Sequence, residues 1–405
     1  MITHILKLIW NQRRQNIFTW IELFVVFVVL FLTVDFIAVH IRLFVAPAGM
    51  NVDHVWQLRL VRRDYKDTTS EDDRKAYFAQ IEQLVEAIPG VECATKLKNF
   101  PFFVNSYSAR GLELDSTRHV NMICEEVNEK YLQTVGLELV RGRWFTKEEV
   151  ERQAGVMVIT SNVAEILHKD SILCPTNRFG EVNGVKNPEI IGIVRPVKFL
   201  DFRPPEFIRY SPSRLDWLFN GFPRMAIRVR PGVKNFPDKF REEIVKHARI
   251  AEFGILPLES ADMLRQQTNR KVTNQITIYG VVTGFLLLTI FLGIGGIFWK
   301  RVLMRRSEIG LRMAVGATSR AVNNQITVEV VCLVLLAVIP AAVVCVHLAF
   351  AELLNVTYFP VTAWRCLMDM GIALALLLTM AILSTRYPAR KAAKVQPVEA
   401  LRANQ

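Results

Sequence analysis

The chain has 405 residues and a formal net charge of +12, and 51% of its residues are hydrophobic. Residues 43–270 hold 33 Lys and Arg against 31 Asp and Glu, a net of +2, so the remaining residues carry +10. This excess lies beside long apolar runs, which is typical of the cytoplasmic loops of a membrane protein and argues against a nucleic-acid-binding surface.

The first predicted elements are an amphipathic cytoplasmic helix over residues 1–16 and a transmembrane helix over residues 17–42. Apolar residues recur at helical spacing near the N-terminus, which favours a helix on the inner membrane face; the alternative is simply the start of the membrane helix. The apolar run that follows can cross about 30 Å of hydrocarbon. A signal peptide is the competing interpretation, but the run is too long and contains two acidic residues.

The two acidic residues of this helix are Glu22 and Asp35. Acidic side chains inside a membrane are candidates for function because they are costly to place there. Both lie near the ends of the run, where the side chain can reach the interface. We therefore favour helix packing or interface hydrogen bonding, with a transport or gating role as the alternative.

Residues 43–259 contain no apolar run long enough to span a membrane. Alternating or β-branched stretches predict strands at 53–62, 91–97, 118–126, 155–160, 189–198 and 223–230. Helical periodicity predicts helices at 73–88, 128–135, 161–168 and 236–249. The proline-rich stretch 199–223 is expected to be irregular. Short mixed elements predict an α+β domain that could divide into two subdomains.

The six cysteines are not arranged as metal ligands, because no C-x-x-C pair occurs. Buried free thiols are favoured over a disulfide. The pairing state of the three cysteines in the insert remains open; they are Cys93, Cys124 and Cys174.

Residues 260–299 are predicted to form one helix, a polar stalk that continues into the second membrane span. Ser260 can cap its first turn. Gly280 and Gly284 have the small-residue spacing of close helix contacts. Contact within the chain and contact in a dimer are equally compatible with this spacing.

The loop at 300–326 carries six basic residues against one acid, and it lies between two apolar runs. The positive-inside rule therefore assigns it to the cytoplasm. A short helix is predicted inside it, capped by Ser307 and ended by Gly316. Thr318 or Ser319 is expected to start the next helix.

Two further membrane helices are predicted at 327–351 and 361–385, joined by a short external loop at 352–360. Arg365 and Asp369 are four residues apart and could form an ion pair. The basic tail at 386–405 is assigned to the cytoplasm, as is the N-terminus. The expected fold is thus a membrane protein of four transmembrane helices with an α+β domain inserted between the first and second.

No catalytic, cofactor-binding or metal-binding motif is recognisable. The sequence lacks G-x-x-x-x-G-K-[ST], H-E-x-x-H and G-x-S-x-G. We expect a non-catalytic subunit, and any ATP that drives it would be bound by a separate ATPase.

The segment R-R-S-E-I-G-L-R-M-A-V-G-A-T and the C-terminal Y-P-A-R-K-A-A-K-V-Q-P-V-E-A-L-R resemble the coupling loop and the tail of MacB/FtsX-type ABC transporter permeases. The insert also resembles the periplasmic core domain of that family. In this family the loop forms a coupling helix that contacts the ATPase. By resemblance the ATPase-coupling residues are Ser307, Glu308, Ile309, Gly310, Leu311, Arg312, Met313, Gly316 and Ala317.

The resemblance implies a protein of the bacterial inner membrane with a periplasmic insert, an ABC ATPase as partner, and a second permease chain that is identical or related. An adaptor protein and an outer-membrane channel could also take part. The implied function is export or efflux of drugs, peptides or toxins by mechanotransmission. The alternatives are lipoprotein release and FtsX-like regulation of cell-wall hydrolases. This chain begins close to its first membrane helix, so it is expected to lack the fused ATPase domain of some family members.

Overall fold

A computed structural model describes residues 13–62, 71–100, 109–113, 119–169, 182–185, 188–214, 224–247, 253–255, 257–304, 311, 315–351 and 359–392. The chain divides into a membrane unit, formed by Met1–Arg42 and Thr273–Gln405, and an insert formed by Leu43–Val272. The predicted fold class, four membrane helices with an inserted α+β domain, is confirmed. The amphipathic helix predicted before residue 13 lies outside the described residues.

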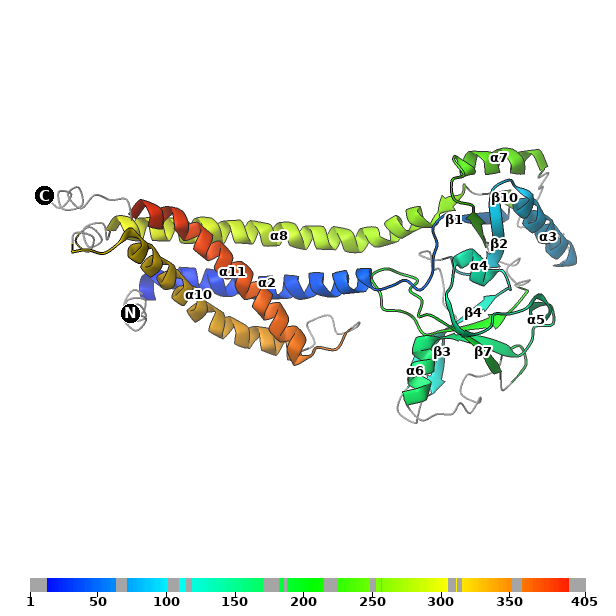
Figure 1. Cartoon of the computed structure of the whole chain (residues 1–405), viewed down its shortest axis with the longest axis horizontal. Helices are drawn as coiled ribbons and strands as arrows, with labels where there is room; N and C mark the ends of the chain where they lie inside the picture. The colour runs from blue at the N-terminus through cyan, green and yellow to red at the C-terminus, as the bar shows by residue number, and fades with distance from the viewer. Residues whose placement is uncertain are drawn as a thin grey trace. The chain divides into compact units, whose positions relative to one another are not determined.

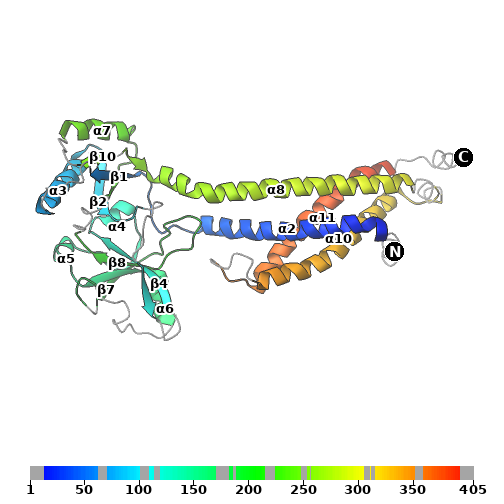
Figure 2. The ribbon, with the colours of Figure 1, turned by 180° about the vertical axis from the view of Figure 1, so that it is seen from behind.

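Four helices in the described part of the chain are long and apolar enough to cross a membrane. They are α2 (Arg13–Val45), α8 (Ala261–Met304), α10 (Ser319–Phe350) and α11 (Ala363–Ala392). The start of α2, the end of α8, the start of α10 and the end of α11 lie at one end of the bundle (Figure 1, Figure 2). This arrangement is the alternating topology expected of four spans.

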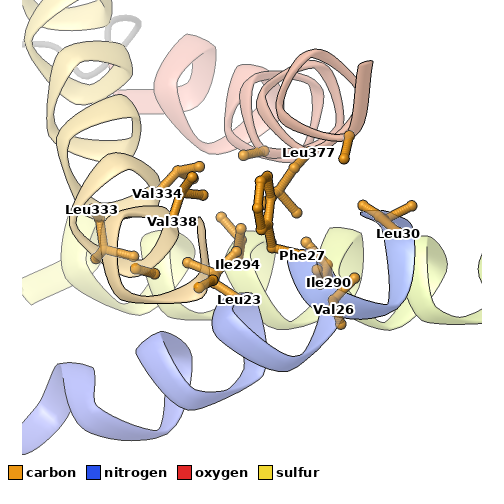
Figure 3. Packing of buried hydrophobic residues seen from close by; sticks show 14 of the residues in the cluster. Leu23, Val26, Phe27, Leu30, Ile290, Ile294, Leu333, Val334, Val338 and Leu377 are labelled. Atoms are coloured by element: carbon orange, nitrogen blue, oxygen red, sulfur yellow. The ribbon is translucent and has the colours of Figure 1, made fainter. Parts of the chain in front are cut away.

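The four helices share one apolar core (Figure 3). On α2, Leu23, Phe27 and Leu30 recur at helical spacing, so their side chains leave one face of the helix. Ile290 and Ile294 of α8 meet them from the opposite side. The buried face of α11 includes Ala373 and Ala381, eight residues apart on either side of Leu377, and small residues of this kind let helix axes approach closely.

The described residues of the insert form two β-sheets. The first is antiparallel, with the order β10-β1-β9-β2, and β11 also pairs with β1. Its strands are β1 (Val55–Arg62), β2 (Val91–Leu97), β9 (Arg224–Val229), β10 (Phe253–Ile255) and β11 (Glu259–Ser260). Apolar side chains of α3 (Glu71–Ala87) and α7 (Phe236–His247) pack on this sheet.

The second sheet is mixed and has the order β3-β4-β8-β6-β7-β5. Its strands are β3 (Ala109–Glu113), β4 (His119–Val127), β5 (Leu139–Gly142), β6 (Val156–Thr160), β7 (Glu189–Val194) and β8 (Ile208–Pro212). The helices between them are α4 (Tyr131–Val135), α5 (Lys147–Glu151) and α6 (Ser161–Lys169). Pairs β4–β8 and β6–β7 are parallel and the others are antiparallel.

The prediction that residues 199–223 are irregular is wrong for β8, which is a central strand between β4 and β6. All five of its residues are buried, so the strand has no polar face and shows no alternation. The prolines before it and at its last position look like loop signals. They are tolerated because Pro212 ends the strand instead of interrupting it.

Polar contacts join the two sheets of the insert. Asn99 lies just after β2, and its Nδ2 donates a hydrogen bond of 2.7 Å to Glu125 of β4. Thr95 of β2 donates to Asn128, which follows β4. Glu125 is 2% exposed, and this burial raises the pKa of its carboxyl to about 7, although the Asn99 hydrogen bond opposes the change.

The raised pKa of Glu125 predicts that the insert loses stability as pH rises. The folded state holds a proton that the unfolded state releases near its ordinary pKa of about 4.3, so stability falls between about pH 4 and pH 7. Above pH 7 the free energy of unfolding should be about 3 kcal/mol lower than below pH 4. We expect Glu125→Gln to remove most of this dependence in thermal unfolding of the full chain from pH 5 to pH 8. Exposed Glu148→Gln is the control; a Glu125→Gln profile that matches it and wild type would contradict the assignment.

Candidate functional site

The predicted coupling loop is described only in part. Ser307, Glu308, Ile309, Gly310, Arg312 and Met313 lie outside the described residues. The amide of Val315 donates to the carbonyl of Leu311 at 3.1 Å, which is a helical hydrogen bond. Gly316 follows with a φ of 104°, a conformation that disfavours other residues, so the helical turn ends at the predicted glycine.

The end of this turn presents apolar side chains. Leu311 is 56% exposed and Val315 is 83% exposed. They are four residues apart, so they share one face of the turn. Ala317 is half-buried next to them. Thr318 then caps α10 by accepting a hydrogen bond from the Ala321 amide at 3.3 Å, and the predicted helix start is confirmed.

An ion pair holds together the two helices that flank the loop. Arg301, near the end of α8, donates to Glu329 Oε1 of α10 at 3.0 Å. The same guanidinium donates to the side chain of Asn16 on α2. Asn16 and Glu329 are buried. Because each partner sits on a different helix, this contact fixes the two arms of the loop to each other and to α2.

A second ion pair lies toward the opposite ends of the helices. Arg365 in the first turn of α11 donates to both carboxylate oxygens of Asp35 on α2, at 2.7 Å from Nε and 2.9 Å from Nη2. The guanidinium thus binds an acid of another helix, whereas the sequence suggested Asp369 of its own helix. Arg365 also donates to the Phe359 carbonyl. The paired arrangement lowers the cost of placing Asp35 within the membrane.

The other predicted packing residues occupy different environments. Glu22 is half-buried on α2 and faces Gly293 of α8, where an added Cβ would lie 3.3 Å from either carboxylate oxygen. Apart from the adjoining residues and backbone of α8 itself, no atom of the described residues lies within 4 Å of a Cβ added at Gly280 or Gly284. Contact of these two glycines within the chain therefore finds no support, and their contact with a second chain stays a prediction.

The structure also reveals a buried polar cluster that the sequence did not indicate. Asp201 lies in the loop between β7 and β8 and accepts hydrogen bonds from two residues of α8. Arg265 Nη2 donates to Oδ1 at 3.0 Å and Asn269 Nδ2 donates to Oδ2 at 2.6 Å. Because Arg265 and Asn269 are four apart, both reach the same carboxylate from one face of the helix.

Lys198 extends this cluster to the last turn of α2. Its buried ammonium donates to the carbonyl of Leu43 at 2.7 Å and to the carbonyl of Asp201 at 3.4 Å. Desolvation lowers the pKa of Lys198. The loop at 198–201 therefore binds both helical segments by which the chain enters and leaves the insert.

Among the described residues, no group of three or more His, Cys, Asp and Glu side chains could hold a metal ion. Five cysteines are described and none of them is in a disulfide: Cys93, Cys124, Cys332, Cys345 and Cys366. Cys174 lies outside the described residues.

Two family models match the chain. Residues 24–247 match the MacB-like periplasmic core domain, and residues 280–397 match the FtsX-like permease C-terminal domain. The periplasmic region of MacB from Actinobacillus actinomycetemcomitans aligns with 56% of this chain and 97% of that chain, at 15% identity and a TM-score of 0.31.

Two curated relatives illustrate the sequence similarity. The probable syringafactin export ATP-binding/permease protein of Pseudomonas syringae is 28% identical over 296 residues, or 68% of this chain and 41% of that protein. The macrolide export ATP-binding/permease protein MacB of Burkholderia thailandensis is 26% identical over 304 residues, or 70% and 43%. The chain thus matches less than half the length of these relatives.

The Asp201 cluster should stabilise the insert. Asp201→Asn would leave Arg265 without its carboxylate, and because Arg265 is partly exposed we expect a loss of about 2 kcal/mol. Thermal unfolding of the full chain in detergent, followed by tryptophan fluorescence, should show a lower Tm. Asp238→Asn, at an exposed acid of α7, is the matched control. A Tm equal to that of the control would contradict a stabilising role for the cluster.

Proposed function

Because the chain belongs to the family with a MacB-like periplasmic core domain and an FtsX-like permease C-terminal domain, we propose that it is the membrane subunit of an ATP-driven exporter. The observation that carries this proposal is the helical turn that ends at Gly316 between α8 and α10. Its exposed Leu311 and Val315 form an apolar face. An ATPase that binds this face would act on both flanking membrane helices.

ATP would be bound outside these 405 residues. The sequence contains no G-x-x-x-x-G-K-[ST] motif, which is the loop that holds nucleotide phosphates in P-loop ATPases. The names of the relatives combine ATP binding with a permease, which supports an ABC ATPase as the partner. The chain itself would be non-catalytic and would need no cofactor of its own.

The four apolar helices and the family place the chain in a bacterial inner membrane. We place the basic loop and both termini in the cytoplasm and residues 43–259 in the periplasm, since the positive-inside rule assigns the Lys- and Arg-rich loops to the inner side. A second permease chain, identical or related, would complete the transporter. A periplasmic adaptor and an outer-membrane channel are further candidate partners.

The ion pairs provide a route for movement. A shift of the cytoplasmic turn would reach α8 and α10 together, because Arg301 binds Glu329 and Asn16. The continuous helix α8 begins inside the insert, where Arg265 and Asn269 bind Asp201. The insert would respond to ATP-driven movement in this way, and the substrate need not pass between the membrane helices.

The substrate class that we propose is drugs, peptides or toxins. One relative is named for macrolide export and another for syringafactin export, which supports export over lipoprotein release or cell-wall regulation.

A charge on the apolar face should weaken ATPase binding. We expect Leu311→Asp to reduce copurification of a P-loop ATPase with the tagged chain at least tenfold, because an aspartate would be buried against the partner. Leu311 is exposed in this chain, so folding should not change. Leu139→Asp, at an exposed leucine of β5, is the matched control. Equal recovery of the ATPase with both variants, measured by quantitative mass spectrometry, would contradict the proposed contact.

A break in α8 should separate ATP hydrolysis from export. Lys271 is exposed in this helix, and Lys271→Pro would cost about 3 kcal/mol of helix stability and bend the segment. We expect ATPase binding to persist while ATP-dependent export falls to background. Lys271→Ala preserves the helix and should export normally. Export by the proline variant at the rate of the alanine variant would rule out transmission through α8.

A further inference from the structure

The membrane unit contains two buried carboxyl groups around a single guanidinium. Asp35 of α2 is 2% exposed and Asp369 of α11 is 4% exposed. Arg365 uses Nε and Nη2 to bind both oxygens of Asp35. Asp369 lies one turn after Arg365 on α11, and its carboxyl is within hydrogen-bonding reach of Asp35. Among the described residues, Arg365 is the cation hydrogen-bonded to this pair, through Asp35.

The surroundings of Asp369 favour a bound proton. An ionised carboxylate only accepts hydrogen bonds, so two carboxyl groups can bond to each other only when one is protonated. Oδ2 of Asp369 has no hydrogen-bond partner among the described residues. With both acids ionised, one negative charge would remain uncompensated among apolar helices, at a cost of several kcal/mol. One bound proton makes the group of three side chains neutral.

The neighbouring titratable groups do not replace this proton. On α2, His40 Nδ1 contacts the Phe36 carbonyl at 2.7 Å. Arg42 lies with its guanidinium 4.6 Å from the centroid of the Phe359 ring. Cys366 of α11 is a buried thiol close to the pair, and Cys345 of α10 is a buried thiol close to Cys366. A thiol is uncharged in its protonated form and adds no positive charge.

The position of the pair suggests what it does. Asp35 lies ten residues before the end of α2 at Val45, and Asp369 lies in the second turn of α11. Both are on the half of the bundle from which the chain enters the insert. The carboxyl pair and the Arg365 ion pair both connect α2 to α11.

We propose that Asp35 and Asp369 form a proton-binding site, which is filled while α2 and α11 are packed together. Loss of the proton creates an uncompensated charge and loosens α11 from α2. The site exchanges its proton with the compartment that contains the insert, so the acidity of that compartment regulates the packing of the bundle. This assignment does not depend on the identity of the exported substrate or of the ATPase.

Infrared spectroscopy of the full chain in lipid nanodiscs tests for the proton directly. At neutral pH the wild type should show the carbonyl band of a buried protonated carboxylic acid, and the band should disappear at high pH. Asp369→Asn, which keeps the size and can still donate to Asp35, should lose the band. Glu22→Gln should keep it, which separates the pair from the other acid of α2. Absence of the band in folded wild type, or its loss only in Glu22→Gln, overturns the proposal.

Thermal unfolding distinguishes a proton site from a purely structural contact. The Tm of the wild type should fall over the same pH range in which the band disappears, and Asp369→Asn should lose this fall. If Asp369→Asn does not fold, Asp35→Asn serves instead, because Arg365 can then balance Asp369 and the acid band should again be lost. A Tm that falls equally with pH in wild type and in the folded asparagine variant overturns the coupling between proton and packing.

Discussion

The cost of placing charge in hydrocarbon shapes the membrane unit. A charged side chain is accepted there only with a partner, and a partner on another helix fixes two helices at once. Arg301 binds Glu329 and Asn16, and Arg365 binds Asp35, so two polar contacts connect the bundle toward its two ends. The apolar core between them supplies contact area, whereas the ion pairs select which residues face each other.

The same principle extends into the insert. Asp201 and Lys198 are buried in a loop of the mixed sheet, and their partners belong to α8 and to the last turn of α2. Each chain segment that joins the insert to a membrane helix is therefore held by directional hydrogen bonds in addition to apolar packing.

Hydropathy and cap residues were sufficient to predict the four spans, the turn ending at Gly316 and the cap at Thr318, because these signals are local. Contacts between distant segments could not be predicted in the same way. The four-residue spacing predicted an ion pair between Arg365 and Asp369 on the same helix, because spacing along one helix carries no information about residues of α2. The central strand β8 was missed because a strand buried on both faces loses its alternation. The cluster around Asp201 joins a loop to two residues that lie 64 and 68 positions further along the chain, so no local pattern could indicate it.

Lys198 recognises main-chain carbonyls at residues 43 and 201, not the side chains of those positions. Every amino acid carries that oxygen, so residue 43 could vary without loss of this bond provided the backbone keeps its path. The hydrogen bonds of the Lys198 ammonium thus depend on the path of the backbone and not on the side chains at residues 43 and 201. A substitution at residue 43 therefore leaves this hydrogen bond in place, whereas a substitution of Lys198 removes it.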